Sequence, residues 1–406
     1  MKILYNGCYC GEKLFNTLLK EQDIPMSYAQ EKLENMLLKG FDKNREIKIS
    51  AVSAVPVRAY PGNKKLLWKF KEFFLFENIT IKQISFINIL VIKQIMLMIG
   101  SLVYSLKWCL KNIKDKNKIM LSYSANPPIL LPMLFVCKLF RVKSIILVTE
   151  LPKFRFFDGQ NSMLRALLLK ILLNVAENLH ELFDGYVFLT EEMKYQINKR
   201  NKPYIVIEGM IDTEQIETVV DESVQKNVKV ILYTGTLNRE YGIPTLIEGF
   251  KKLGREDTEL WFCGQGNFMD DIKAISEDFK RIRYLGMLSY NKVHQLQTKA
   301  DFLINPRPTD EEYTKYCFPS KTLEYMLTGT PVISTKLIGI PSDYDKYLIY
   351  IEDETVIGYA EKLKEILKNN YSKYKMQAEN GKEFVILNKS TQKQVMKIIE
   401  FAMKLN

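Results

Sequence analysis

Short apolar runs rich in β-branched and aromatic residues recur along the chain, separated by stretches with helical periodicity. From residue 229 onward these runs are KVILYTG, ELWFCG, IRYLG, DFLIN, PVIST and YLIYIED. A strand, a helix and another strand repeated about every 20–30 residues predict βαβ units and a parallel sheet. The runs KILYNG, IKISAVSAV, KIMLSYSA, SIILVTE and GYVFLTE repeat this order in the first half. The sequence therefore predicts an α/β protein with two doubly wound, Rossmann-like domains in tandem.

The length of 406 residues is sufficient for two domains that each bury a core. We expect an N-terminal domain over residues 1–207 and a second domain over 229–371. Between them, residues 208–228 are polar and acidic and predict a linker. The final residues, 372–406, predict a helical segment that packs back toward the first domain.

Positive charge is concentrated in the first half of the chain. Residues 1–207 hold 31 Lys+Arg and 17 Asp+Glu, a net charge of +14, whereas the remainder holds 27 and 30, a net of −3. No pattern typical of nucleic-acid recognition accompanies this charge, so we expect no nucleic-acid partner. Six cysteines without a CxxC pair favour a reduced, cytoplasmic protein. The two histidines, His180 and His294, are far apart, which argues against a His-rich metal site or a Ser-His-Asp triad.

An apolar run over residues 84–106 raises the question of a membrane. It is long enough to cross a bilayer, but Asn88, Lys93 and Gln94 lie in its middle, and a charge near a bilayer centre costs roughly 3 kcal/mol. Residues 64–118 contain 11 lysines against three acidic residues. This mixture predicts contact with an anionic membrane surface without a span. A buried helix flanked by solvated lysines is the open alternative.

The segment CFPSKTLEYMLTGTPVIST, residues 317–335, predicts a short helix with Ser320 as N-cap and Lys321 as the first helical residue. A cation at the positive end of a helix is disfavoured by about 0.3–1 kcal/mol, which indicates an anionic ligand. Ser320, Lys321 and Glu324 share one helix face. A nucleoside diphosphate fits this face, with its phosphates at the helix start and its ribose hydroxyls on Glu324. A Lys321–Glu324 ion pair is the alternative, although Lys before Glu is the poorer order.

The run FPSKTLEYMLTGTPVIST resembles the signature of GT-B glycosyltransferases of family 4, the bacterial group that builds capsules, exopolysaccharides and O-antigens. The runs LYTGTLNREYGIPTLIEGF, LWFCGQG and IRYLGMLSYNKVHQLQTKADFLINPRP follow in the order of that group, so the resemblance extends over about 229–352. SYSANPPILLPML and LTEEM resemble its acceptor domain more weakly. The resemblance implies two Rossmann-like domains facing across a cleft.

The resemblance also implies a function. It implies a hexosyltransferase that moves a sugar from a nucleotide-diphosphate donor, with a UDP-sugar favoured, to a lipid-linked saccharide, and that retains the anomeric configuration. It implies no cofactor and no obligatory metal. We expect a cytoplasmic protein held at the inner face of the plasma membrane, in a possible complex with other polysaccharide-assembly enzymes.

Particular residues are implied for these roles. The donor-binding residues are Gly235, Thr236, Gly264, Gly266, Leu288, Arg307, Ser320, Lys321 and Glu324. Lys321 and Arg239 are expected to stabilise the leaving group, with Glu150 as a catalytic base or sugar-binding group. The loop NGCYCG, with Gly7 and Gly11, is expected to face the acceptor and the donor phosphates, or else to be a turn that needs glycine.

The sequence departs from the family pattern at three donor-site positions. Tyr316 stands where the first acid of the paired acidic motif is expected, and Thr236 and Tyr241 stand where an Arg and a Lys commonly hold the diphosphate. Glu150 is the only ionisable group at the strand end where a catalytic histidine is common. Three interpretations follow: an enzyme with its charge supplied from other positions, a catalytically inactive GT-B partner subunit, or a nucleotide-sugar epimerase. The basic surface in the first half counts against the epimerase.

Overall fold

The computed structural model describes residues 1–406 apart from 12–13, 16, 19–27, 71, 124–125, 152–177, 214–227, 370 and 406. The chain forms two compact units. Unit 1 comprises Met1–Met210 and Thr391–Asn406, and unit 2 comprises Ile211–Ser390.

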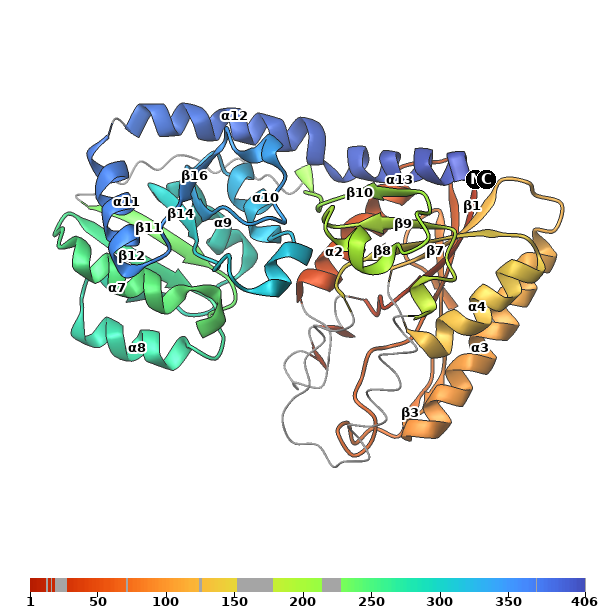
Figure 1. Ribbon diagram of the computed structural model, residues 1–406. Coiled ribbons are helices and arrows are strands. Elements are labelled where there is room, and N and C mark those ends of the chain that lie inside the picture. The colour runs from red at the N-terminus through yellow and green to blue at the C-terminus, as the bar shows by residue number, and fades with distance from the viewer. Residues whose placement is uncertain are drawn as a thin grey trace. The chain divides into compact units, whose positions relative to one another are not determined.

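Unit 1 is built on an eight-stranded sheet with the order β10-β9-β8-β7-β1-β2-β5-β4 (Figure 1). Neighbouring strands run parallel except at the edge strand β4, which pairs antiparallel with β5. The strands are β1 (Lys2–Gly7), β2 (Lys48–Ser53), β4 (Glu72–Phe74), β5 (Ile79–Gln83), β7 (Lys118–Ser122), β8 (Lys143–Val148), β9 (Gly185–Phe188) and β10 (Tyr204–Val206). Two short strands, β3 (Leu67–Trp68) and β6 (Phe86–Ile87), form a separate antiparallel pair.

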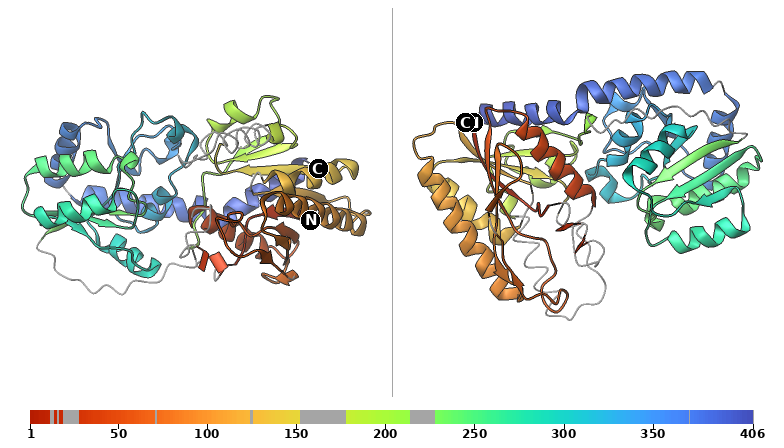
Figure 2. Two further views of the ribbon diagram at one scale, coloured as in Figure 1. Left: turned by 90° about the horizontal axis from the view of Figure 1, so that it is seen from below. Right: turned by 180° about the vertical axis from the view of Figure 1, so that it is seen from behind.

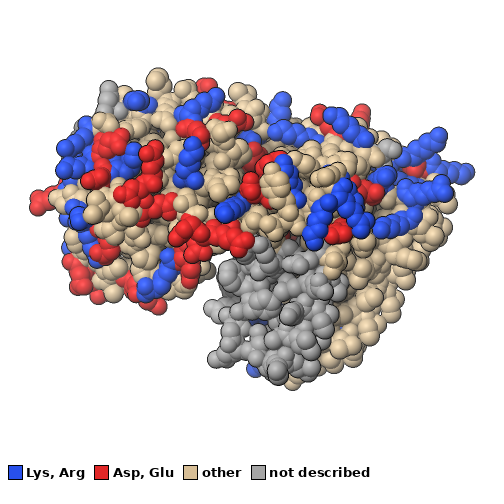
Figure 3. Space-filling model, viewed as in Figure 1, with Lys and Arg blue, Asp and Glu red and all other residues tan. Residues whose placement is uncertain are grey.

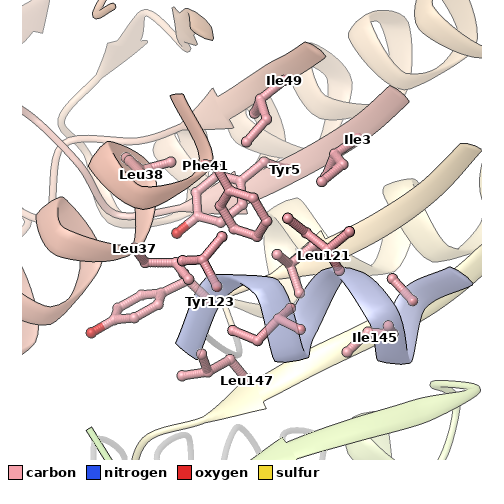
Figure 4. Packing of buried hydrophobic residues seen from close by; sticks show 14 of the residues in the cluster. Ile3, Tyr5, Leu37, Leu38, Phe41, Ile49, Leu121, Tyr123, Ile145 and Leu147 are labelled. Carbon is pink, nitrogen blue, oxygen red and sulfur yellow. The ribbon is translucent and has the colours of Figure 1, made fainter. Parts of the chain in front are cut away.

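Helices cover both faces of this sheet. On one face, α3 (Leu90–Lys111) and α4 (Pro127–Leu139) pack side by side, as Figure 1 and both views of Figure 2 show. On the other face lie α2 (Tyr28–Asp42) and α13 (Thr391–Leu405), whose apolar side chains meet those of the strands. Figure 4 shows Leu37, Leu38 and Phe41 of α2 directed at the sheet, and Leu121, Ile145 and Leu147 beside the violet helix α13. The short helix α6 (Met193–Ile197) follows β9. The core of unit 1 thus includes the last helix of the chain.

Unit 2 has a fully parallel six-stranded sheet with the order β13-β12-β11-β14-β15-β16. Its strands are β11 (Lys229–Thr234), β12 (Thr258–Cys263), β13 (Ile282–Tyr284), β14 (Phe302–Asn305), β15 (Val332–Thr335) and β16 (Leu348–Ile351). Its helices are α7 (Ile243–Leu253), α8 (Met269–Asp278), α9 (Tyr290–Lys299), α10 (Ser320–Leu327), α11 (Val356–Lys368) and α12 (Tyr371–Lys389), with 3-10 turns η3 (Arg239–Tyr241), η4 (Glu312–Tyr316) and η5 (Ser342–Tyr344). After β13 the chain returns to the other side of β11, where β14 pairs with it. The strand order therefore reverses between β11 and β14, and ligands commonly bind at such a switch point.

The predicted α/β architecture is confirmed, because each of the short apolar runs predicted as strands contains a strand of one of the two large sheets. Strands such as β7, β9 and β14 are buried at every position, as expected when helices cover both faces of a sheet. The predicted linker, 208–228, falls largely on 214–227, outside the described residues. The helical segment predicted over 372–406 is divided between the units: α12 packs on α10 in unit 2, and α13 belongs to unit 1.

Candidate functional site

Two glycine turns meet at the carboxyl edge of the unit 2 sheet. Gly235 follows β11 with φ 119°, and Gly264 follows β12 with φ 142°. A Cβ atom on Gly264 would lie 1.8 Å from the carbonyl oxygen of Gly235, so only glycine allows the two turns to touch through their backbones. The amide of Gly235 also donates to the carbonyl of Cys263 at 2.8 Å. The result is a flat backbone surface without side chains at the strand switch.

Lys321, from α10, lies directly on this surface. A Cβ atom on Gly235 would be 2.2 Å from its Cε and 2.5 Å from its Nζ. The ammonium donates to the hydroxyl of Tyr233 at 2.7 Å and lies 4.2 Å from the centre of that ring. This hydroxyl in turn donates to the carbonyl of Thr236 at 2.7 Å. Gly235 is therefore the residue that lets the lysine reach this position, and Tyr233 is the residue that fixes it.

Arg307 supplies a second cation, from the loop after β14. Its guanidinium carbon lies 4.4 Å from the ring centre of Tyr241 in η3, and its Nη1 is 3.8 Å from the sulfur of Cys317. No described residue accepts a hydrogen bond from its buried Nε, and none bonds the buried hydroxyl of Tyr313 nearby. A buried guanidinium with unused donor capacity and an aromatic support is suited to a planar or tetrahedral anion.

The electrostatics of the two cations reinforce this interpretation. The pKa of Lys321 lies well below its usual value of 10.5, because burial removes water from the ammonium and, secondarily, because Arg307 repels it; Glu324 acts in the opposite direction. Part of the Lys321 side chain reaches the surface, but its ammonium is enclosed by Tyr233 and the Gly235 turn. Arg307 and Lys321 repel each other, so a bound anion would relieve the repulsion between them.

The helix α10 is held against the sheet by Tyr325, one residue beyond Glu324. The Tyr325 hydroxyl accepts from the amide of Thr234 at 2.9 Å and donates to its carbonyl at 3.1 Å. Sequence reasoning missed Tyr325 because its hydroxyl bonds a strand about 90 residues away. The predicted N-cap was wrong by one residue: Pro319 is the N-cap, Ser320 is the first helical residue and its exposed side chain makes no cap hydrogen bond. Lys321 is accordingly the second helical residue.

Comparison with known proteins identifies the domain that carries this site. Residues 228–369 match a family model described as Glycosyl transferases group 1. Unit 2 contains a group 1 glycosyltransferase domain. This result confirms the prediction of a glycosyltransferase and is consistent with the resemblance seen over 229–352. A search of curated proteins gives no match to the chain.

Solved structures show the same fold over the whole chain. HepE (Alr3699) from Anabaena, in complex with UDP, has 13% sequence identity and a TM-score of 0.64, with 100% of each chain covered. Sucrose-phosphate synthase from Thermosynechococcus elongatus has 12% identity and a TM-score of 0.62, covering 100% of this chain and 98% of that chain. The lipopolysaccharide outer core galactosyltransferase WaaB has 15% identity and a TM-score of 0.61, covering 100% and 99%. These likenesses confirm the predicted GT-B fold.

The other donor residues predicted in the glycosyltransferase domain lie at the same edge of the sheet but differ in their burial and in the contacts that they make. Gly266 allows close approach to the carbonyl of Leu237, which would be 2.4 Å from its Cβ. Thr236 is exposed, and Leu288 is half-buried after β13. Arg239 is engaged elsewhere.

The guanidinium of Arg239 forms an ion pair of 2.5 Å with Asp271 in α8 and lies 4.4 Å from the ring centre of Phe268. Its charge is therefore already compensated, in contrast to that of Arg307. The predicted phosphate role of Arg239 requires release of Asp271 and stays a prediction.

In unit 1, glycine is required at Gly7 for steric reasons and at Gly11 for its backbone conformation. A Cβ on Gly7 would lie 1.8 Å from Oε1 of Glu34 in α2, whereas Gly11 has open space around it and a φ of 87°. The Glu34 carboxyl accepts from the Tyr5 hydroxyl and from the amide of Cys8, both at 3.0 Å. Burial raises the pKa of Glu34 to about 8. No local pattern indicated Glu34, since its partners Tyr5 and Cys8 precede it by 29 and 26 residues.

Glu150 follows β8 at the carboxyl edge of the unit 1 sheet and is half-buried. Its charge acts on Tyr123, which follows the neighbouring strand β7 and whose pKa is raised well above its usual value, chiefly by burial. The hydroxyl of Tyr123 donates to the carbonyl of Gln30 at 2.7 Å. Glu150 thus lies at the ligand-binding edge of its own sheet, and its catalytic role stays a prediction.

Proposed function

We propose that the chain transfers a hexose from a nucleoside-diphosphate donor, with a UDP-sugar favoured, to a lipid-linked saccharide in surface-polysaccharide synthesis. The observation that carries the donor half is the pair of neighbouring cations, Lys321 at the Gly235 turn and Arg307 over the Tyr241 ring. Glu324 lies one helical turn beyond Lys321. The solved complexes of HepE with UDP and with UDP-glucose support the choice of uridine. The name of WaaB, a lipopolysaccharide outer core galactosyltransferase, supports a surface saccharide as acceptor.

In this proposal the donor diphosphate lies between Lys321 and Arg307, at the start of α10. When the bond between the sugar and the phosphate breaks, negative charge develops on the leaving diphosphate, and desolvated cations stabilise that charge more strongly than solvated ones. The Glu324 carboxylate accepts from the ribose hydroxyls. The acceptor hydroxyl gives its proton to a donor phosphate oxygen, with retention at the anomeric carbon, and no metal is required.

The proposal takes Arg307 as the second cation in place of the predicted Arg239. Arg307 replaces Arg239 as the partner of Lys321, because Arg239 is paired with Asp271 whereas Arg307 has a buried Nε without a described partner. Glu150 remains the proposed base or sugar-binding group of unit 1. We place the reaction at the cytoplasmic face of the plasma membrane, where a lipid-linked acceptor and other assembly enzymes are available.

Calorimetric titration of the full chain with UDP, GDP, ADP and CMP tests the donor site. We expect one diphosphate to bind, and Glu324→Ala to weaken this binding by about ten-fold or more through loss of charged hydrogen bonds to the ribose. Glu361→Ala, at an exposed carboxylate in α11, is the matched control and should bind as the wild type does. Folded protein that binds none of the four nucleotides would overturn the proposal and favour the inactive partner subunit.

A further inference from the structure

The helix α3 exposes a long apolar stripe on its outer side, which an ordinary surface helix does not. Its exposed residues include Val91, Ile95 and Ile99, at one helical turn from one another and each at least 50% exposed. The complete exposed apolar set of this helix and its flanks is Ile87, Ile89, Leu90, Val91, Ile92, Ile95, Met98, Ile99, Val103, Leu110 and Ile113. A soluble surface helix normally places such residues inward and its polar residues in water.

The inward side of α3 carries three hydrogen-bonded polar residues, Lys93, Ser101 and Ser105, beside the apolar Leu97 and Trp108. The Lys93 ammonium donates to the carbonyl of Val57 at 2.7 Å, and the Ser101 hydroxyl donates to the carbonyl of Ile129 at 2.7 Å. The Ser105 hydroxyl donates to the carbonyl of Ser101 at the same distance. Polar groups that are satisfied inside the protein, behind an apolar outer side, are typical of an element whose outer environment is not water.

The neighbouring helix α4 continues this apolar surface. Leu131, Phe135 and Leu139 are four residues apart, and Phe135 and Leu139 are 64% and 65% exposed. Because α3 and α4 pack side by side, their outward residues form one surface, here named the α3–α4 face. Contiguous apolar surface of this kind on a folded chain marks a site of contact with a lipid or a protein.

The distribution of charge around this face favours a lipid partner over a protein partner. Residues 78–149 contain ten Lys and Arg and a single acid, Asp115, which pairs with Lys2 at 2.7 Å. In Figure 3 the surface over α3 and α4 is almost free of charge, and Lys and Arg gather where the two helices end. The exposed cations near these ends are Lys107, Lys111, Lys114, Lys116, Lys138, Arg141 and Lys143.

The opposite end of α3 is basic as well. Exposed Lys64, Lys65 and Lys69 flank β3, which pairs with β6 just before the helix begins, with Leu67 opposite Ile87. Cations at both ends of an apolar surface match the phosphates of anionic lipids around an acyl interior.

We propose that the α3–α4 face docks on an anionic bilayer, with both helices lying in the plane of the interface. α3 has the length and composition to cross a membrane, since its 22 residues extend over about 33 Å. A crossing would remove it from α4 and β6 and would place Lys93 in hydrocarbon. The in-plane position keeps every contact of unit 1. The proposal is independent of the donor site, which lies entirely on residues of unit 2.

Sedimentation of the full chain with phosphatidylcholine vesicles, with and without phosphatidylglycerol, tests this surface. We expect binding to the anionic vesicles that weakens with salt, and weak binding to neutral ones. The triple variant Val91→Gln, Ile95→Gln, Ile99→Gln should bind anionic vesicles about ten-fold less tightly or worse, because three apolar side chains no longer enter the bilayer. All three side chains point outward, and circular dichroism with thermal unfolding of the variant and the wild type shows whether the fold is intact.

A matched triple variant carries the same change elsewhere: Ile357→Gln, Met376→Gln, Leu387→Gln, at positions of unit 2 that are 52–65% exposed. It should bind vesicles as the wild type does. Equal binding by the two triple variants would overturn the proposal, as would a wild-type chain that ignores anionic vesicles. If the wild type instead forms a dimer that the first triple variant abolishes, and vesicles do not compete, the face is an interface between copies of this chain and the proposal is wrong.

Discussion

Replacement of Lys321 by Met should separate ligand binding from stability, because the lysine contributes to the two in opposite directions. A charged hydrogen bond to a diphosphate oxygen contributes about 1.5–3 kcal/mol, so Lys321→Met should weaken UDP binding by about 10- to 150-fold. In the free protein the buried ammonium has a neutral hydroxyl, that of Tyr233, as its hydrogen-bond partner. Met has a similar length and no charge, and Tyr233 keeps its own bond to Thr236. We expect the variant to be as stable as the wild type or more stable by about 1 kcal/mol.

The pH dependence of folding stability gives an independent test of the role of Lys321. Because its pKa is lowered in the folded chain, the unfolded chain binds a proton that the folded chain lacks between the lowered value and 10.5. The stability of the wild type should therefore rise with pH through this window, and that of Lys321→Met should lack the rise. Denaturant titration at several pH values measures the difference. In calorimetry at alkaline pH, UDP binding by the wild type should take up a proton, because the diphosphate raises the pKa of Lys321.

Two results would refute this reasoning. UDP affinity of Lys321→Met within about two-fold of the wild type would show that the ammonium does not meet the phosphates. A variant that binds weakly and is also destabilised by about 2 kcal/mol or more would show that the lysine is a structural residue. Lys364→Met, at an exposed position of α11, is the control for the substitution itself. It should alter neither the UDP affinity nor the folding stability.

Three further predictions concern the glycine turn, the second cation and the buried acid. Gly235→Ala should reduce UDP binding by about ten-fold or more and cost about 1–3 kcal/mol of stability, whereas Gly254→Ala, also at positive φ but with no atom closer than 3.8 Å to its Cβ, should leave UDP titrations unchanged. Arg307→Lys should weaken UDP binding by about ten-fold because an ammonium cannot stack flat on Tyr241, and equal affinity would contradict the phosphate role. Since the pKa of Glu34 is about 8 in the folded chain against a usual 4.5, stability should fall as pH rises from 4.5 to 8; denaturation of Glu34→Gln should show no such fall, and parallel pH profiles would refute the shift.

The fold was predictable from the sequence because parallel strands are buried on both faces. Runs such as the FLIN of β14 are then apolar at nearly every position and stand out between amphipathic helices. The edge strands β4 and β10 were not predicted: they are short and only partly buried, so their sequences lack such runs. Which side of α3 faces the core could not be predicted either, because hydrophobic periodicity shows that a helix has two different sides without showing which of them is buried.

The candidate site was predictable where neighbours in sequence carry it. Lys321 and Glu324 lie on one short helix, so their relation follows from helical geometry. Arg307 was predicted only as one donor residue among several, and its stacking on Tyr241 depends on a contact between η3 and a loop 66 residues later. The support of Lys321 by Tyr233 likewise joins residues 88 positions apart. Contacts of this kind are set by the packing of the finished sheet and have no local signal.

The place of α13 in the core of unit 1 has a consequence for biosynthesis. Its residues Val395, Ile398 and Ile399 pack with Leu37 and Leu38 of α2, yet they are synthesised only after all of unit 2. At about 5–20 residues per second, the 180 residues of Ile211–Ser390 take about 10–40 s to translate, and during this time α2 covers its face of the N-terminal sheet without α13. Unit 2, which is continuous in sequence, can fold in that interval. Unit 1, whose synthesis begins first, is thus completed after unit 2, and loss of α13 would damage the unit made first.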